Sequence, residues 1–243
     1  MRIFVDPAAL APGELVVRGD EHHYLSHVRR ARPGELVELV DGAGRRARAT
    51  IARIGERETV LDAEAPEHVA PALPYVRALV PLIKGDRMDT CIEKLVEVGV
   101  DAIVVWQAAR SVARPGADRR DGRLAKYQAI AQAAARQSGR THVPRVTGGG
   151  ELATALAGLP DAHAGTAAPA GPGQRFVLDP TSAAALVPGA ADITVISGPE
   201  GGFAPDELDR LAGFTPAGLG PRVLRAETAP VIAVALIRAA THT

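Results

Sequence analysis

From Arg2 to about Glu67, apolar and polar residues alternate in short runs, a pattern typical of β-strands. Pro-Gly, Gly-Asp and Asp-Gly pairs separate the runs and indicate turns. The runs cover residues 2–5, 14–19, 35–44, 46–54 and 58–65. Strands this short and closely spaced predict a small β-barrel. Residues 20–30 begin with acidic side chains and end before Pro33-Gly34, so they predict a short helix.

Beyond this region the pattern changes to strands that alternate with helices. Residues 69–75 contain two prolines and no periodicity, which predicts a linker. Strands are expected at 75–83, 101–107, 175–180 and 193–198, and helices at 87–99, 121–138, 151–159 and 230–240. This alternation predicts a mostly parallel sheet that is covered on both faces. Residues 158–173 are rich in glycine, alanine and proline and predict a mobile surface loop.

Two of the expected helices have informative apolar faces. The helix over 87–99 carries one apolar stripe, on which Cys91 is expected to be a core residue, and Gly99 is expected to end it. The helix over 230–240 is apolar nearly all round. It must therefore be buried in the core or against a second subunit.

Composition sets the class of protein. With 243 residues, 47% of them hydrophobic, the chain is long enough for a substantial core, and we expect two domains. A single cysteine permits no intramolecular disulfide. The chain has no signal-peptide region and no apolar run long enough to span a bilayer, so we expect a cytoplasmic protein without a membrane partner.

The formal net charge is zero, but the charges are unevenly distributed. Residues 107–146 hold nine basic side chains against two acidic ones, whereas residues 147–243 hold five basic and nine acidic. A polyanion such as RNA is able to bind the basic middle without being repelled by the whole chain. A solvated helix face explains the same arginines equally well, so charge alone does not decide.

Two glycine-rich loops follow the last expected strands. The run ITVISG breaks into PEGG, and GLGPRVLRAETA comes shortly after. Gly198, Gly201 and Gly202 leave main-chain amides unshielded at the end of a strand, and PDEL then begins a helix with proline in its first turn. Ligands bind at this place in α/β proteins. The two loops therefore predict a small molecule that is held largely by backbone.

Other common chemistries find little support. The chain has no GxGxxG after its first strand, no GxxxxGK[ST] and no GxSxG, which argues against dinucleotide, P-loop and hydrolase sites. His23 and His27 are spaced to share a helix face and would allow a zinc pair. Since no cysteine or carboxylate stands at ligand spacing, a surface or RNA-facing pair is favoured, and no metal is expected.

The glycine loops also carry side chains that are able to bind ions or polar groups, namely Glu200, Arg222, Arg225, Glu227 and Thr228. These residues suit binding of a zwitterionic nucleoside, and here the sequence resembles a known family. ISGPEGGFAPDEL followed by LGPRVLRAETA resembles the signature of SPOUT-class RNA methyltransferases, specifically the bacterial family that methylates uracil N3 in small-subunit (16S) ribosomal RNA. RIFV, HYLSHVRR, KGDRMDTCIEKLVEVGV, ARSV and AARQSGRTHVP are similar to family blocks in the same order. The sequence departs from the family at Arg29, Tyr127 and Arg136, where leucine, tryptophan and glutamate are usual. These departures concern RNA contacts more than chemistry.

The resemblance implies an N-terminal β-barrel similar to PUA domains over residues 1–70, and a C-terminal SPOUT α/β domain over 74–243 with a parallel sheet threaded into a trefoil knot. Periodicity does not predict a knot, because knots are very rare. It also implies S-adenosylmethionine as cofactor, the small ribosomal subunit as partner, and a homodimer in which each subunit completes the other's active site.

The resemblance also implies which residues act. Glu200 is the candidate proton acceptor, and Arg225 the candidate for stabilising charge on the uracil oxygens. The alternatives are that Glu200 caps a helix or orients its loop, and that Arg222 and Arg225 brace the knot through carbonyl contacts. The cofactor is expected to contact Leu178, Asp179, Pro180, Ser197, Gly198, Pro199, Glu200, Gly201, Gly202, Leu219, Gly220, Arg222, Val223, Leu224, Arg225, Glu227, Thr228 and Ala229. RNA is expected to contact His23, Arg30, Arg110, Arg114, Arg136 and Arg140.

Two other functions stay open at this point. One is a SPOUT methyltransferase that acts on a ribose 2′-OH or on transfer RNA, since its glycine loops would be similar in outline. The other is a non-catalytic RNA-binding factor for ribosome assembly that has kept the fold.

Overall fold

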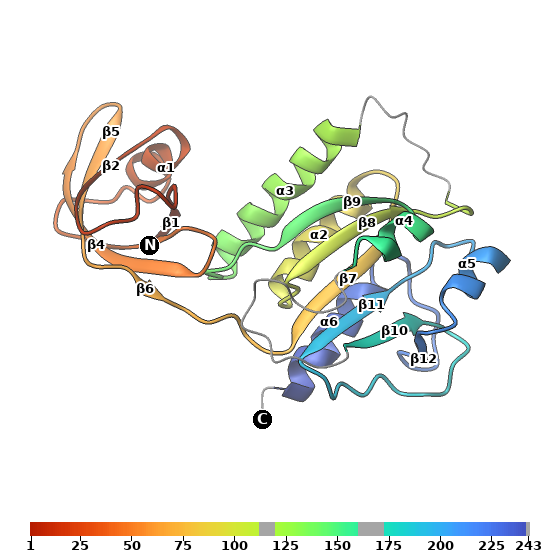
Figure 1. The fold of residues 1–243 in the computed structure, drawn as a ribbon. Helices are drawn as coiled ribbons and strands as arrows, with labels where there is room; N and C mark the ends of the chain where they lie inside the picture. Colours follow the sequence, from red (N-terminus) through yellow and green to blue (C-terminus); the bar gives the residue numbers. More distant parts are fainter. Residues whose placement is uncertain (112–119, 160–172, 242–243) are drawn as a thin grey trace. The chain divides into compact units, whose positions relative to one another are not determined.

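The computed structural model describes residues 1–111, 120–159 and 173–241. The chain divides into two compact units (Figure 1), one of Met1–Pro71 with Ala135–Val143 and the other of Ala72–Ala134 with Pro144–Thr243. The change of unit between Pro71 and Ala72 falls inside the expected linker, 69–75. The first unit also takes in Ala135–Val143, which the expected domains 1–70 and 74–243 do not consider. Those domain limits stay a prediction.

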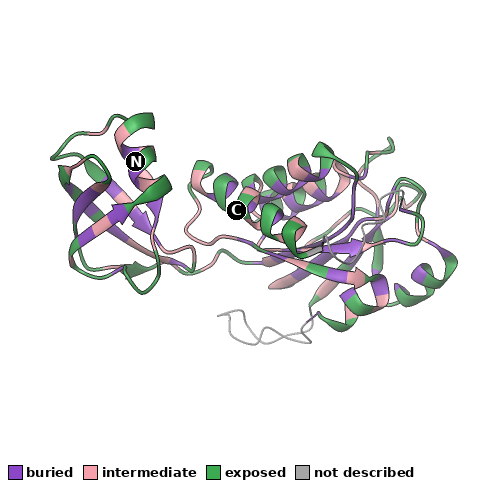
Figure 2. Cartoon of the chain, turned by 90° about the horizontal axis from the view of Figure 1, so that it is seen from above, coloured by how far each residue is buried: buried purple, intermediate pink, exposed green. Residues whose placement is uncertain are grey.

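The first unit is built on a curled six-stranded sheet in the order β1-β3-β4-β5-β2, with β6 paired to β4. Its strands are β1 (Arg2–Phe4), β2 (Gly13–Arg18), β3 (Leu36–Val40), β4 (Arg45–Ile54), β5 (Glu58–Ala63) and β6 (Glu67–His68). All five expected strands are present. Along β4 the buried Ala47, Ala49 and Ile51 alternate with exposed residues, as a half-buried strand requires. Figure 2 shows the buried residues gathered inside the sheet.

The expected helix over 20–30 is present but has an irregular second half. It begins as α1 (Gly19–His23) and continues as a π-helix, η1 (Tyr24–Val28). The Arg29 amide accordingly donates to the carbonyl of Tyr24, five residues back, at 2.8 Å. The Ser26 hydroxyl donates to the carbonyl of His22 at 2.7 Å, and such back-bonding competes with the regular helix pattern.

The second unit has a six-stranded parallel sheet in the order β12-β10-β11-β7-β8-β9. The strands are β7 (Tyr75–Pro81), β8 (Ala102–Gln107), β9 (Arg145–Glu151), β10 (Gln174–Leu178), β11 (Asp192–Ile196) and β12 (Thr215–Ala217). The helices are α2 (Asp86–Glu97), α3 (Arg120–Gln137), α4 (Leu152–Ala157), α5 (Pro205–Arg210) and α6 (Ala229–Thr241). Six successive residues of β7 are buried, so both faces of the sheet are covered, as expected.

The sequence missed the two edge strands of this sheet. β9 contains three consecutive glycines and β12 has a central proline, and both residue types are poor strand formers. The glycines serve packing. A Cβ at Gly149 would lie 2.7 Å from Ala155 Cβ and 2.9 Å from Val104 Cγ1, so only glycine lets α4 approach β9 this closely.

Helices α2 and α6, which correspond to the two expected helices with apolar faces, pack against each other. Helix α6 also packs on β7 and β11. Cys91 of α2 is buried, as expected, and burial raises the pKa of its thiol to about 12. One face of α6 is buried, whereas Ile232 and Leu236 are exposed, so the expectation of burial holds for part of this helix. No helix in the described part of the chain is long and apolar enough to cross a membrane. The expected loop over 158–173 lies almost wholly outside the described residues.

Candidate cofactor and catalytic site

A cavity of about 380 Å³ lies in the second unit, at the carboxyl ends of β10, β11 and β12. All the residues expected to contact the cofactor line it except Gly201, Glu227 and Thr228. We call it the cofactor cavity. It has three lining residues that sequence reasoning missed, Phe203, Ala217 and Ala226. Ala217 ends an unexpected strand, and Phe203 directly follows the glycine loop and stacks on Trp106, with 5.9 Å between ring centroids.

The first glycine loop, residues 197–202, is shaped by contacts that side chains would prevent. A Cβ at Gly198 would lie 2.9 Å from the ring of Phe203, and one at Gly201 would lie 3.1 Å from Arg110 Cβ. Gly202 has a φ of +70°, and its amide bonds to the Pro199 carbonyl at 2.9 Å. The loop therefore needs these three glycines for its own turn and for its contact with Arg110.

The loop ends in α5, where Glu207 fixes the chain. Its Oε2 accepts a hydrogen bond from the Ala204 amide at 2.8 Å, which satisfies a free amide at the helix start. Its Oε1 accepts one from the Ala109 amide at 2.9 Å. The buried Glu207 carboxylate thus ties the chain after β8 to the glycine loop. Glu200 does not cap this helix, so that alternative interpretation of Glu200 loses support.

The second glycine loop runs from β12 to α6. A Cβ at Gly218 would lie only 2.1 Å from the Ser182 carbonyl oxygen, and the Gly218 amide bonds to Ala184 at 2.8 Å. Gly220 has a φ of +113°. The carbonyl of Arg225 accepts hydrogen bonds from the amides of Thr228 and Ala229, at 2.9 and 3.0 Å, at the start of α6. This loop is therefore also set by backbone geometry.

The residues present suit a nucleoside that carries an amino acid. Ser197 lines the cavity and is 2% exposed, and its buried hydroxyl has no hydrogen-bond partner among the described residues. Buried polar groups normally have partners, which makes this hydroxyl a candidate contact for a ligand. Leu178, Leu219 and Leu224 supply apolar walls for a ring. The arrangement fits S-adenosylmethionine, in which a charged amino acid is joined to an adenosine.

A chain of charges lies beside the cavity. Arg87 of α2 donates to Glu200 Oε1 at 2.9 Å, and its Nη1 lies 3.7 Å from Glu227 Oε2. Arg225 Nη1 lies 3.9 Å from the other oxygen of Glu227. The Glu227 side chain is 14% exposed, whereas that of Arg225 is 77% exposed. The pairing with Arg87 supports a loop-orienting role for Glu200, and leaves its role as proton acceptor a prediction.

Arg87 is a functional candidate that sequence reasoning missed. It stands in the KGDRMD block, but α2 and the glycine loop are far apart in sequence and only the fold joins them. Neither Arg222 nor Arg225 donates a hydrogen bond to a carbonyl of any described residue, so the bracing interpretation gains no support.

The residues expected to contact RNA have different surroundings. Arg110 is exposed beside the cofactor cavity and donates to the Gly201 carbonyl at 3.3 Å. Arg136 is half-buried in the first unit, where it forms an ion pair with Glu21 and lies over the rings of Phe4 and Tyr24. These contacts give Arg136 a structural role. Arg114 lies outside the described residues.

The remaining RNA candidates lie in the first unit. His23 is exposed and stacks on His27, with 4.8 Å between ring centroids. Arg30 is exposed and has a φ of +50°. The Arg140 amide bonds to Ala135 at 2.9 Å beyond the end of α3. Within the described residues no third potential metal ligand accompanies the histidine pair.

Comparison with known proteins agrees with this geometry. The profile of an RNA methyltransferase domain matches residues 71–238, and that of an RNA methyltransferase PUA domain matches residues 17–62. The ribosomal RNA small subunit methyltransferase E of Mycobacterium tuberculosis is 36% identical over 98% of this chain and 90% of its own length. The protein of the same name from Bacillus subtilis is 29% identical over 91% of this chain and 88% of its own.

Two solved structures are similar over nearly the whole chain. A putative methyltransferase from Legionella pneumophila, in complex with S-adenosylmethionine, has a TM-score of 0.82 at 25% identity, covering 98% of this chain and 97% of its own. A ribosomal RNA small subunit methyltransferase E from Neisseria gonorrhoeae, bound to S-adenosylmethionine, has a TM-score of 0.80 at 29% identity, covering 98% and 96%. The expected PUA-like barrel and parallel-sheet α/β domain are confirmed, and the knot stays a prediction. Together, these matches show that the chain belongs to the RNA methyltransferase family that includes the ribosomal RNA small subunit methyltransferase E proteins.

Proposed function

We propose that this protein transfers the methyl group of S-adenosylmethionine to N3 of a uracil in 16S small-subunit ribosomal RNA. The observation that carries the proposal is the cofactor cavity, in which two glycine loops meet the carboxyl ends of three parallel strands. Relatives that are similar along the whole chain are named as ribosomal RNA small subunit methyltransferases, and two similar structures hold S-adenosylmethionine.

S-adenosylmethionine supplies an electrophilic methyl group on a sulfonium centre. The chain supplies the apolar walls for the adenosine, among them Leu178 and Leu224, and the unpartnered Ser197 hydroxyl for a polar group. Gly198 and Gly202 bring the main chain of the first glycine loop to the same cavity.

Uracil N3 carries a proton and is a Watson–Crick donor, so the chain must accept an unpaired base and remove that proton. Glu200 is the proposed acceptor because its carboxylate lines the cofactor cavity and Arg87 holds one of its oxygens. Glu227 lies within ion-pair distance of both Arg87 and Arg225. The largely exposed Arg225 side chain is the proposed group that approaches the uracil oxygens and stabilises negative charge there.

The direct test is to incubate the purified protein with labelled S-adenosylmethionine and small subunits that lack the modification. Mass spectrometry of nuclease digests should locate the label on N3 of one uridine. A label on a ribose 2′-OH, or on transfer RNA offered in parallel, would assign the protein to another SPOUT activity. Tight RNA binding without any cofactor binding in calorimetry would indicate an assembly factor instead.

A homodimer is part of the proposal. Ile232 and Leu236 expose apolar side chains on α6, whose other face is buried, and a second subunit would cover them. Sedimentation should give twice the mass of the 25.2 kDa chain, and Leu236→Glu should reduce it. A wild-type protein that sediments as a monomer at micromolar concentration would contradict this part. We also propose a cytoplasmic location, since that is where bacterial ribosomal RNA is processed, and a knotted chain at the cofactor cavity.

A further inference from the structure

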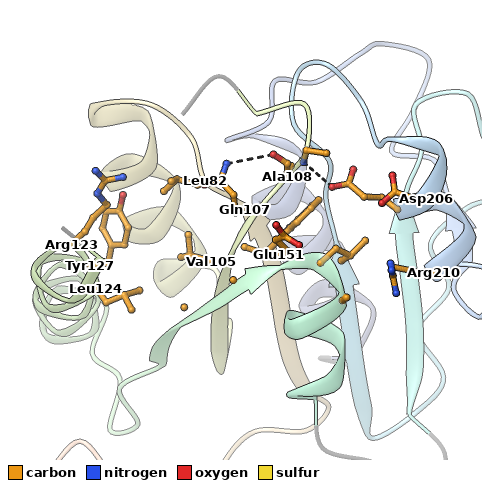
Figure 3. A pocket seen from close by; sticks show the side chains of 17 residues that line it. Leu82, Val105, Gln107, Ala108, Arg123, Leu124, Tyr127, Glu151, Asp206 and Arg210 are labelled. Carbon is orange, nitrogen blue, oxygen red and sulfur yellow. Dashed lines mark hydrogen bonds between the residues drawn. The ribbon is translucent and has the colours of Figure 1, made fainter. Parts of the chain in front are cut away.

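The second unit contains another cavity, of about 520 Å³, at the carboxyl ends of β8 and β9 (Figure 3). Residues of β8, α3, β9, α4 and α5 line it, and it shares no lining residue with the cofactor cavity. We call it the β8–β9 cavity. Its volume lies in the range of small-molecule sites. Neither the proposed chemistry nor the glycine loops account for it.

Glycines in β9 keep this cavity open. A Cβ at Gly148 would lie 2.9 Å from Leu124 Cδ1, and Gly150 has a φ of +67°, which side chains rarely adopt. Both glycines line the cavity. Tyr127 and Trp106 form aromatic parts of the wall and are 5% and 0% exposed. Two buried aromatic side chains therefore form part of the wall.

Charged groups without partners surround the cavity. Figure 3 shows Arg123 beside Tyr127 on one side, Arg210 near Asp206 on the other, and Glu151 between the two arginines. None of these four charged side chains forms an ion pair or a hydrogen bond with another described residue. Glu151, Asp206 and Arg210 are exposed, so water solvates them in the free protein, and a ligand with anionic and donor groups is able to pair with them.

The wall also contains a buried donor that lacks an acceptor. Trp106 Nε1 is fully buried and has no hydrogen-bond partner among the described residues. Leaving such a donor unpaired lowers stability, so its persistence needs an explanation. The same indole stacks on Phe203, which lines the cofactor cavity, with an interplanar angle of 6°. The two cavities thus lie on either side of one aromatic pair.

We infer that the β8–β9 cavity binds one nucleotide of the RNA substrate other than the methylated uridine. The inference rests on the proposed function. RNA is read mainly through splayed-out bases that stack on aromatic side chains and hydrogen-bond by their edges. Here Tyr127 lies beside the base, Arg123 pairs with its phosphate, and the Glu151 carboxylate accepts from its edge. A carboxylate accepts only, so the base must present N–H donors to it. An exocyclic amino group of adenine, cytosine or guanine offers two N–H donors, whereas uracil offers only its N3–H, so the inference is a base other than uracil.

Kinetics of two variants test this inference. Glu151→Gln and Arg123→Ala should each raise KM for the small subunit about tenfold. Glu151→Gln removes the negative charge and replaces one acceptor oxygen by a donor, and Arg123→Ala removes the phosphate contact. The Kd for S-adenosylmethionine and the thermal midpoint should stay within about twofold and about 2 °C of wild type. Arg145→Ala is the matched control, because Arg145 is exposed and lines neither cavity. Unchanged KM in both variants, or an equal rise in the control, would overturn the inference.

A cycle that combines RNA and protein changes identifies the base. Single nucleotides of the substrate RNA are replaced by uridine in turn, and KM is measured with wild type and with Glu151→Gln. At one position, replacement by uridine should raise KM about tenfold with the wild type and should raise it no further with Glu151→Gln. Absence of any coupled position would contradict the inference. Competitive inhibition of wild type by free AMP, CMP or GMP without such coupling would assign the cavity to a free nucleotide instead.

Failure of this inference and failure of the proposed function give different results. If wild type transfers no methyl group to uracil N3, the proposed function fails. If it does, and the variants behave like wild type, only the inference fails.

Discussion

The two cavities of the parallel sheet differ in what lines them. The cofactor cavity is formed largely by two continuous loops whose shape depends on glycines, such as Gly198 and Gly218. The β8–β9 cavity is lined by side chains from five separate elements, with unpaired charges at Arg123, Glu151 and Arg210. Charged residues line the cofactor cavity too, among them Asp179, Glu200 and Arg222, so the two cavities differ in their continuous loops and not in their charge. The difference supports the proposals of a cofactor in the first cavity and a nucleotide of the RNA in the second.

The largest expected effect concerns chemistry in the cofactor cavity. Glu200→Gln should lower kcat about 100-fold, the lower range for loss of a general base, with little change in cofactor affinity. Single-turnover methyl transfer and calorimetry with S-adenosylmethionine measure the two quantities. Asp209→Asn on the exposed side of α5 is the control. A near-normal kcat would eliminate Glu200 as proton acceptor and leave its contact with Arg87 as its role.

The backbone character of the cofactor cavity gives the second prediction. Gly198→Val should weaken S-adenosylmethionine binding by about 100-fold, because its side chain would overlap the ring of Phe203, and overpacking costs about 1–3 kcal/mol. Gly213→Ala is the matched control, since a Cβ there meets nothing within 4 Å. If calorimetry gives equal affinities for the two variants, the shape of the first glycine loop does not determine cofactor binding.

A smaller effect is expected at Ser197. Ser197→Ala should weaken cofactor binding about fivefold, because the ligand loses a hydrogen bond worth about 1 kcal/mol. The free protein should become slightly more stable, since a buried hydroxyl without a partner is removed. Calorimetry and thermal unfolding report the two changes. Unchanged affinity would mean that the hydroxyl does not face the ligand.

The smallest expected effect is on stability, and it concerns Arg136, which has an ion-pair partner in Glu21. Burial raises the pKa of the Glu21 carboxyl above its usual 4.5, and Arg136 opposes this rise. Because the folded pKa is raised, Glu21 makes the protein less stable as the pH rises through the window above 4.5. Arg136→Ala should therefore cost about 1 kcal/mol at pH 7 and less at pH 4. Urea unfolding at both pH values measures the difference.

The control for that experiment is Arg29→Ala, since Arg29 is exposed in the same unit. If Arg136→Ala leaves stability unchanged at pH 7 but weakens RNA binding, Arg136 is an RNA contact, as the sequence predicted, and its ion pair with Glu21 is incidental.

The sequence predicted the site well where the site residues are close neighbours along the chain. Most residues of 197–202 and 219–229 line one cavity because short glycine loops at strand ends bring their own neighbours together. It failed at β9 and β12, since glycine and proline conceal strands that only tertiary pairing holds in place.

Sites that depend on distant pairing were also missed. Arg87 meets Glu200 across 113 positions, and no local pattern records that contact. Arg136 was expected at RNA because of its charge, but the sequence does not show that Glu21 lies within reach. The β8–β9 cavity likewise has no motif, because its charged residues come from separate helices and strands.

A crystal structure of the protein with S-adenosylmethionine tests the central claim most directly. The account predicts the ligand in the cavity between the two glycine loops, with one of its polar groups within hydrogen-bond distance of the Ser197 hydroxyl. A ligand found in the β8–β9 cavity, or a cofactor cavity that stays vacant at saturating concentration, would contradict it.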